Sequence, residues 1–340
     1  MTALESVLTA NSDMKIPVID IGPYLADEAG ALEATARAIG AASESLGFYF
    51  LGNHGIPQAL IDRVFAQTQR FHEQPLEKKL AVQAIGKVIG YLPLGGQTQN
   101  TSIYGKSTYP DASASFYIKR EFAADHPDRR AKKPWVQDNR WPSDLPGFRE
   151  TCLEYFDAMT ALGHQMLRAQ AVALDMAPDY FATHAAFNPS GSTLRLLHYP
   201  PRDPAKDGQF GIGPHTDYGY CTYLAQAKKP GLEILTKSGE WIEAPALEGY
   251  FLVNNADMCR RWTNDRWRSA PHRVINKTGE VRYSIPFFFG VRADVKLECL
   301  PSCTSAANPP KYPPMSFADY LAELEPKNYV LAKAPASAQA

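Results

Sequence analysis

The pattern of apolar and polar positions divides the chain into an early part with long helices and a later part with short strands. Apolar residues recur every three or four positions over residues 27–46 and 148–172, the spacing of amphipathic helices, and a further helix is expected over residues 57–71. Compact apolar runs at residues 15–20 and 48–51 flank the first helix and predict short strands. This part of the chain is therefore expected to alternate strand and helix.

After residue 192 the pattern changes to short β-rich runs that are separated by Gly, Pro and Asn. Runs of this length at close spacing are typical of an antiparallel sandwich or barrel. One more helix is expected at residues 316–324. The expected fold class is therefore mainly β with flanking helices. The predicted strands lie at residues 193–199, 220–225, 231–235, 250–254, 272–276 and 281–289.

We expect a single domain over residues 15–330, because no internal repeat or linker interrupts the chain there. Residues 85–141 have poor periodicity and are rich in Gly, Ser, Tyr, Pro and Asp, so they are expected to form an irregular lid over a functional site. The other expected parts are a flexible arm (1–14), a mostly helical N-terminal part (15–180), the β core (192–300), a C-terminal segment with a helix (301–330) and a disordered tail (331–340).

Composition and charge narrow the functional classes. Hydrophobic residues make up 45% and charged residues 21% of the chain, a balance that excludes a wholly disordered or fibrous protein. The 35 Lys and Arg against 36 Asp and Glu give a net charge of −1, so no overall field attracts nucleic acid or an anionic membrane. A small-molecule partner is therefore expected, and no protein partner is implied.

Cysteine usage and the N-terminus indicate the compartment. The 5 cysteines include no Cys-x-x-Cys pair, which favours reduced thiols. The N-terminus lacks the basic region and apolar core of a signal peptide, and no apolar run approaches the length of a membrane span. The expected location is the cytoplasm.

Three residues form a candidate metal site. His215 and Asp217 are two positions apart, so on an extended chain both side chains project to the same side. His272 begins a later β-rich run, and a barrel could bring it alongside them. Two imidazoles and one carboxylate on one face of a metal leave open positions, as in non-haem Fe(II) oxygenases, whereas zinc is more often held tetrahedrally with one open site. An Fe(II) centre is therefore favoured.

Arg282 and Ser284 indicate an anion site in the same barrel. They share one face of the run at residues 281–289, and the apolar neighbours on both sides predict that this strand is buried. A guanidinium fork with a nearby hydroxyl suits a carboxylate. Because burial of an unpaired arginine is expensive, a bound anion is a good explanation for it.

These motifs, in their order and spacing, resemble the isopenicillin N synthase-like branch of the Fe(II)/2-oxoglutarate-dependent dioxygenases. The resemblance extends from about residue 15 to 325. It implies a double-stranded β-helix, or jelly roll, with Fe(II) held by His215, Asp217 and His272. The segments that carry it are Pro17-Val-Ile-Asp20, Gly47-Phe-Tyr-Phe-Leu-Gly-Asn-His-Gly-Ile56, His215-Thr-Asp-Tyr-Gly219, Trp262-Thr-Asn264, His272-Arg-Val-Ile-Asn276 and Arg282-Tyr-Ser284.

The resemblance also implies the cosubstrates and the reaction. Arg282 and Ser284 would hold the distal carboxylate of 2-oxoglutarate, with Tyr199 nearby, and Leu197 stands where plant members carry an asparagine. Oxidative decarboxylation of 2-oxoglutarate by O₂ would be coupled to oxidation of a small metabolite. Hydroxylation is the outcome most often implied, and desaturation or cyclisation can follow the same hydrogen abstraction.

Three residues are candidates for substrate contact. Arg195 lies on the same side of its strand as Tyr199 and could recognise a carboxylate or phenolate, unless it pairs with an acidic neighbour or lies outside the barrel. Phe288 should project inward with Arg282, although an aromatic residue on a barrel strand is more often part of the core. Phe116 is a possible contact from the lid, in a segment where Ser113 and Ala114 replace the Lys-Glu pair of related sequences.

Two other functions remain open at this point. An oxidase like isopenicillin N synthase would use Fe(II) and O₂ without 2-oxoglutarate, with the arginine and serine holding the carboxylate of the substrate itself. A non-catalytic ligand-binding barrel could retain the fold without the chemistry. The presence of all three candidate ligands and of the Arg-x-Ser pair argues against the second of these.

Overall fold

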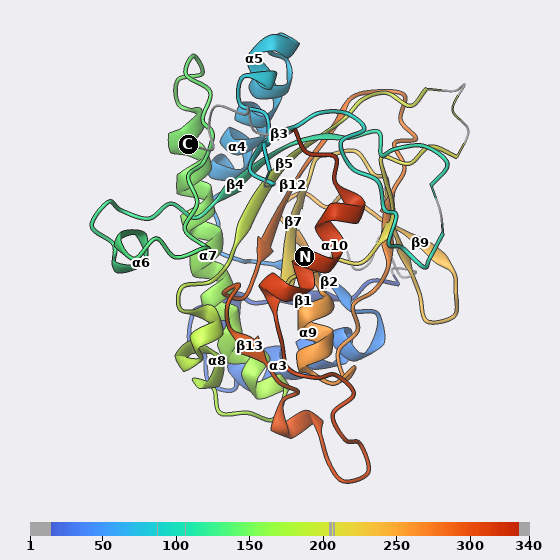
Figure 1. Ribbon diagram of the computed structural model, residues 1–340. Helices are drawn as coiled ribbons and strands as arrows, with labels where there is room; N and C mark the ends of the chain where they lie inside the picture. The colour runs from blue at the N-terminus through green and yellow to red at the C-terminus, as the bar shows by residue number, and fades with distance from the viewer. Residues whose placement is uncertain (1–14, 87, 106, 204–205, 207, 333–340) are drawn as a thin grey trace.

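The computed structural model describes residues 15–86, 88–105, 107–203, 206 and 208–332, and these form two main β-sheets with helices outside them (Figure 1). The large sheet has eight strands and the small sheet four. In spatial order, the large sheet contains β1 (Val18–Asp20), β2 (Phe48–Gly52), β10 (Phe251–Asn255), β7 (Cys221–Gln226), β12 (Arg282–Phe289), β5 (Thr193–Tyr199), β4 (Ala114–Lys119) and β3 (Gly90–Leu92). The small sheet contains β6 (Ile212–His215), β11 (His272–Val274), β8 (Leu232–Leu235) and β9 (Trp241–Ala244), and β13 (Lys296–Leu297) pairs separately with β14 (Met315–Ser316).

Helices cover the outer face of the large sheet. Helices α3 (Ala31–Ser45) and α4 (Gln58–His72) pack on α7 (Phe148–Ala173), and all three contact strands of this sheet. Strands β1 and β2 pair in parallel because α3 lies in the crossover between them. The remaining helices are α2 (Gly22–Leu25), α5 (Leu76–Leu80), α6 (Pro127–Arg130), α8 (Tyr180–Thr183), α9 (Asp257–Trp262) and α10 (Phe317–Asn328), with 3₁₀ turns at Ala185–Phe187 and Pro301–Cys303.

The predicted strands of the later part agree with the structure within a few residues. Strand β5 has the bounds expected from the sequence, and β7, β8, β10, β11 and β12 correspond to the other five runs. Two strands of the small sheet were not predicted: β6 lies within a Gly- and Pro-rich segment, and β9 has four residues. The long helices expected before residue 173 are also present, as α3, α4 and α7. Periodicity in the sequence therefore predicts the inner strands and the main helices.

A helical N-terminal half is not confirmed. Four strands, β1 to β4, come from the first 119 residues and join the large sheet. Two of them, β3 and β4, lie within residues 85–141, which are therefore not irregular throughout. All residues of β4 except the last are buried, so this strand has no apolar–polar alternation by which it could be recognised.

Both ends of the chain fall largely outside the described residues. The arm expected at residues 1–14 and most of the tail expected at 331–340 belong to this undescribed part. Ala332 forms a β-bridge with Ile85, so the ordered chain extends slightly further than expected. Within the described residues, no helix is long and apolar enough to cross a membrane.

Helix and sheet approach each other closely at Gly163 in α7. A Cβ atom at this position would lie 2.6 Å from Cε2 of Phe289 on β12. The missing side chain therefore lets α7 lie directly on the strand that also carries Arg282 and Ser284.

We expect Gly163→Ala to lower the free energy of unfolding by about 1–3 kcal/mol, because overpacking outweighs the roughly 0.5–1 kcal/mol that alanine gains over glycine in a helix. Urea unfolding followed by circular dichroism measures this. Gly40→Ala in α3 is the matched control, since a Cβ there would be 3.7 Å from its nearest neighbours and should stabilise the protein. A stabilising effect at both glycines would contradict the close approach.

Candidate active site

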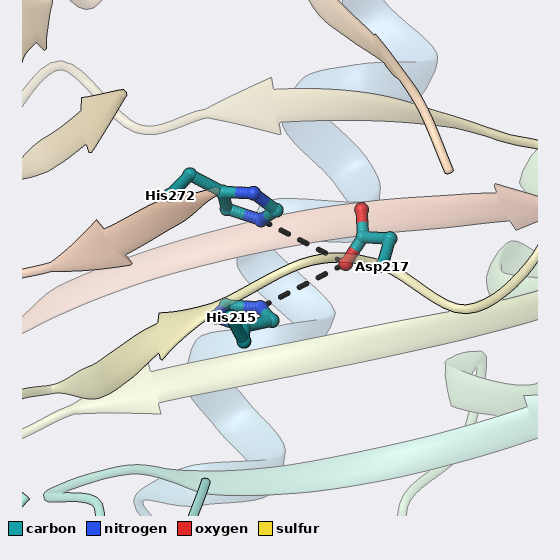
Figure 2. A group of neighbouring side chains, drawn as sticks. All are labelled: His215, Asp217 and His272. Carbon is teal, nitrogen blue, oxygen red and sulfur yellow. Dashed lines mark ion pairs between the residues drawn. The ribbon is translucent and has the colours of Figure 1, made fainter. Parts of the chain in front are cut away.

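His215, Asp217 and His272 converge on one point between the two sheets (Figure 2). His215 ends β6 and His272 begins β11, and the two residues are paired across these neighbouring strands. The Nε2 atoms of both imidazoles lie 3.7 Å from Oδ1 of Asp217. One ligand atom from each residue lies within 4.8 Å of the other two, so the three side chains could hold one metal ion.

Backbone carbonyls orient both imidazoles. Nδ1 of His215 lies 2.8 Å from the carbonyl oxygen of Gly213, and Nδ1 of His272 lies 3.2 Å from that of Ala270. If each Nδ1 carries the proton, each Nε2 has a free lone pair directed towards the others. This is the arrangement that metal-binding histidines usually show.

Asp217 is held by two side chains of the large sheet. Its Oδ2 accepts hydrogen bonds from Oγ1 of Thr222 at 2.6 Å and from Nδ2 of Asn254 at 2.8 Å. Its other oxygen, Oδ1, is the one that faces the two imidazoles. One oxygen of the carboxylate is thus anchored to the protein and the other remains available to a metal.

The electrostatics of the cluster favour the protonation states that bind metal. Burial and the neighbouring His272 lower the pKa of His215 to about 3, which keeps its imidazole neutral. Burial alone would raise the pKa of Asp217, but the two imidazoles and the two hydrogen bonds lower it overall, so the carboxylate stays ionised. A neutral imidazole and an ionised carboxylate are the ligand forms that coordinate a divalent cation.

Arg282 is a buried cation without an anion beside it. Its side chain is 1% exposed, its Nε donates to the carbonyl oxygen of Lys229 at 3.2 Å, and both Nη atoms lack any acceptor among the described residues. The guanidinium carbon lies 5.0 Å from the ring centre of Tyr199. The hydroxyl of Ser284 lies 3.4 Å from that of Tyr199. Two unsatisfied N–H edges and two hydroxyl groups fit a carboxylate.

A single cavity connects this arginine with the histidine cluster. Its space between atoms is about 1120 Å³ including the solvent-open mouth. Arg195, Tyr199 and Phe288 also line it, in agreement with the alternation expected for their strands. Residues from both main sheets and from α10 form its walls, so the sheets enclose the site and the C-terminal helix borders it.

Phe116 does not line the cavity. Its side chain is fully buried on the other face of β4, with its ring centre 4.7 Å from that of Phe71 and 5.4 Å from that of Phe148. The expected substrate contact is therefore wrong for this residue. The neighbouring Tyr117 and Lys119 of the same strand line the cavity instead.

Leu197 fills the position where plant members carry an asparagine. It belongs to a small apolar cluster with Tyr199, Ile212 and Val274. This side of the cavity therefore offers packing where an asparagine would offer hydrogen bonds.

Several cavity residues escaped the sequence analysis. Thr222 and Asn254 lie in strands that are mostly apolar and buried, and a polar residue in such a strand is the signal that could have identified them. Glu325 follows Phe317 and Leu321 at steps of four on α10, which places the three on one side of the helix. All three line the cavity.

Comparisons with known proteins agree with this geometry. A family model described as the N-terminal region of non-haem dioxygenases in morphine synthesis matches residues 16–144, and a model of the 2OG-Fe(II) oxygenase superfamily matches residues 190–291. The 2-oxoglutarate-Fe(II) type oxidoreductase hxnY of Emericella nidulans is 34% identical over 324 residues, which cover 94% of this chain and 91% of the relative. The 2-oxoglutarate-dependent dioxygenase tropC of Talaromyces stipitatus is 34% identical over 301 residues, covering 85% of this chain and 90% of that protein.

Solved structures give the same result. A full-length Neurospora crassa protein, crystallised in complex with alpha-KG, superposes with a TM-score of 0.77 at 32% identity, covering 91% of this chain and 95% of that one. A putative 2OG-Fe(II) oxygenase family protein from Caulobacter crescentus has a TM-score of 0.77 at 29% identity, with 91% and 97% covered. These neighbours share the jelly-roll fold, and the relatives are named as enzymes, so a non-catalytic barrel is not supported. The chain belongs to the 2OG-Fe(II) oxygenase superfamily, whose members are dioxygenases that use Fe(II), 2-oxoglutarate and O₂.

Proposed function

We propose that His215, Asp217 and His272 hold the Fe(II) of this dioxygenase, and that Arg282 and Ser284, beside Tyr199, bind the distal carboxylate of 2-oxoglutarate. The enzyme would then oxidise a small molecule in the same cavity, with hydroxylation as the proposed outcome. The single observation that carries the proposal is the pair of unsatisfied Nη atoms of Arg282 in the cavity that also contains the His-Asp-His cluster.

The chain itself would supply the metal ligands, the hydrogen bonds that orient them and the cavity walls that exclude water. When Fe(II) and 2-oxoglutarate are bound, they supply O₂ activation and oxidative decarboxylation. His215 and His272 present their Nε2 atoms, and Thr222 and Asn254 keep Oδ1 of Asp217 directed towards them. These three residues would hold the metal and would leave positions open for the cosubstrate and O₂. The apolar walls exclude water and so strengthen the ionic contact at Arg282.

The proposed small-molecule partner and compartment have separate support. The Neurospora crassa protein has also been crystallised with alpha-KG and thymine, which is an example of a small ligand in a related protein. All five cysteines are free and four of them are buried, which supports a reducing compartment such as the cytoplasm.

We expect a weak visible absorption band when Fe(II) and 2-oxoglutarate are added together without oxygen, and succinate release once oxygen enters. His215→Ala should lose both because it removes one metal ligand. His126→Asn is the matched control, since His126 caps α6 and does not line the cavity, and asparagine can also cap a helix. Substrate oxidation without any 2-oxoglutarate would instead favour an oxidase like isopenicillin N synthase.

Thr222→Val should weaken metal binding about 10- to 100-fold, because Asp217 loses one of the two hydrogen bonds that orient it. Equilibrium titration with Fe(II) or Mn(II) measures the change. Thr160→Val is the control, since the hydroxyl of this buried threonine bonds only within α7. Equal metal affinity of the parent and Thr222→Val would show that Thr222 does not position the carboxylate.

Arg282→Met should raise the free energy of unfolding of the ligand-free protein by about 1–3 kcal/mol, because it removes an uncompensated buried charge. The same substitution should abolish stabilisation by 2-oxoglutarate in thermal unfolding. Arg273→Met should bring no such gain, since Arg273 is ion-paired with Glu233 at 2.7 Å. Undiminished stabilisation of Arg282→Met by 2-oxoglutarate would refute the proposed role of Arg282.

A further inference from the structure

We propose that the molecule oxidised by this enzyme carries a carboxylate, and that Arg195 and Lys119 bind this group in a second anion subsite of the cavity. The inference rests on the proposed function, because it takes Arg282 as the partner of 2-oxoglutarate. It goes further by naming the chemical class of the substrate and the side chains that select it.

Arg195 has a buried guanidinium group, and only one of its three nitrogen atoms donates hydrogen bonds. Its side chain is 4% exposed and lines the cavity. Only Nη2 donates hydrogen bonds, to Oε1 of Gln97 at 2.7 Å and to Oγ of Ser115 at 3.0 Å, while Nε is buried and has no acceptor among the described residues. The guanidinium carbon lies 4.8 Å from the ring centre of Tyr117. The neutral contacts therefore fix the position of the charge without neutralising it.

No carboxylate of the described residues lies within 4.0 Å of this guanidinium, so Arg195 is not a structural ion pair. Asp111 is the acidic residue whose charge interacts with Arg195, and its Oδ1 accepts a hydrogen bond from the backbone N–H of Gly213 at 2.9 Å. Burial raises the pKa of Asp111 to about 7, so near neutral pH this carboxyl group is only partly ionised. The hydrogen bonds of the Arg195 guanidinium thus go to neutral side chains, which leaves its charge without a contacting carboxylate among the described residues.

Lys119 places a second cation beside Arg195. In the pairing of β4 with β5, Tyr117 lies opposite Arg195 and Lys119 opposite Thr193. Lys119 and Arg195 are therefore diagonal neighbours on one face of the sheet, with backbones about 7–8 Å apart. Nζ of Lys119 donates to Oγ1 of Thr193 at 2.6 Å, and burial lowers its pKa. A carboxylate between the two cations would satisfy both.

Glu325 is the acidic group that faces the same part of the cavity. It lies on α10, more than 4.0 Å from Nζ of Lys119, and burial raises its pKa. Because one carboxylate does not offset two cations, the net charge of the subsite is positive. Apolar side chains surround it and would contact the remainder of the substrate: Phe288, Phe317 and Leu321.

The strand register separates this subsite from the one proposed for 2-oxoglutarate. Arg282 pairs with Tyr199, which is four residues from Arg195 on β5. At about 3.3 Å per residue the two levels are roughly 13 Å apart along the strand. In the proposed function, 2-oxoglutarate would use its 2-oxo acid end at the metal and its distal carboxylate at Arg282, so neither carboxylate of the cosubstrate would remain for Arg195. A different anion is required there.

The test measures the preference for charged over neutral ligands in the full chain. Mn(II) replaces Fe(II) and prevents turnover, and saturating 2-oxoglutarate occupies the Arg282 site. The probes are benzoate, phenylacetate and 3-phenylpropionate, each compared with its primary amide by isothermal titration calorimetry. We expect at least one acid to bind about 10- to 100-fold more tightly than its amide. In Arg195→Gln this preference should fall to within about threefold.

Matched variants separate recognition from damage to the fold. Arg195→Lys should keep part of the preference because it keeps the charge, and Lys119→Met should reduce it. Arg120→Gln should leave it unchanged, since Arg120 follows Lys119 in the chain but does not line the cavity. Affinity for 2-oxoglutarate, measured on each variant, reports that the cavity is intact.

Three outcomes would overturn the inference: equal binding of every acid and its amide, an acid preference that survives in Arg195→Gln, or no binding of any acid to protein that binds Mn(II) and 2-oxoglutarate normally. Failure of the parent protein to bind Mn(II) and 2-oxoglutarate would refute the proposed function itself. The two failures are therefore distinguishable within one series of titrations.

Discussion

Hydrogen bonds from the large sheet to Asp217 hold together a site whose histidines belong to the small sheet. Thr222 on β7 and Asn254 on β10 fix one carboxylate oxygen, while His215 and His272 stand on the paired strands β6 and β11. The three candidate ligands can meet only when the two sheets face each other in one arrangement. Packing on the outer face of the large sheet, such as the contact of α7 with β12 at Gly163, therefore contributes to its geometry.

The cavity contains more positive than negative charge that the protein leaves uncompensated. Arg282, Arg195 and Lys119 all face it without an ion pair within 4.0 Å among the described residues, while Asp217 is committed to the histidine cluster. Burying such groups costs several kcal/mol each unless an anion joins them. A large apolar core behind the sheet offsets this cost. An anionic ligand would remove part of this cost when it binds, and this gain would add to its affinity.

The sequence predicted well whatever depends on local periodicity and on motif order. The inner strands and the three long helices follow from spacing, and the order of the motifs indicated that His215, Asp217 and His272 would converge. Prediction failed where a residue's environment depends on its neighbours in the sheet. Strand β4 has no alternation because both of its faces are covered, and the orientation of Phe116 is set by pairing with Leu196, which faces the helices. The partners of Asp217 come from two strands distant in sequence, which no motif links.

The register of β5 unites the metal-proximal region and both anion subsites. Arg282 lies opposite Tyr199, Ser284 opposite Leu197 and Phe288 opposite Thr193, so the inward positions of β5 and β12 form successive levels of one surface. A slip of one residue would turn Arg195, Leu197 and Tyr199 together towards the helices, because side chains alternate along a strand. The register that places the proposed cosubstrate site at Arg282 therefore places Arg195 as well. By contrast, β4 lines the cavity only through Tyr117 and Lys119, opposite Arg195 and Thr193. Changes on β4 can alter the substrate without disturbing Arg282, which makes this strand the part of the sheet where specificity is free to diverge.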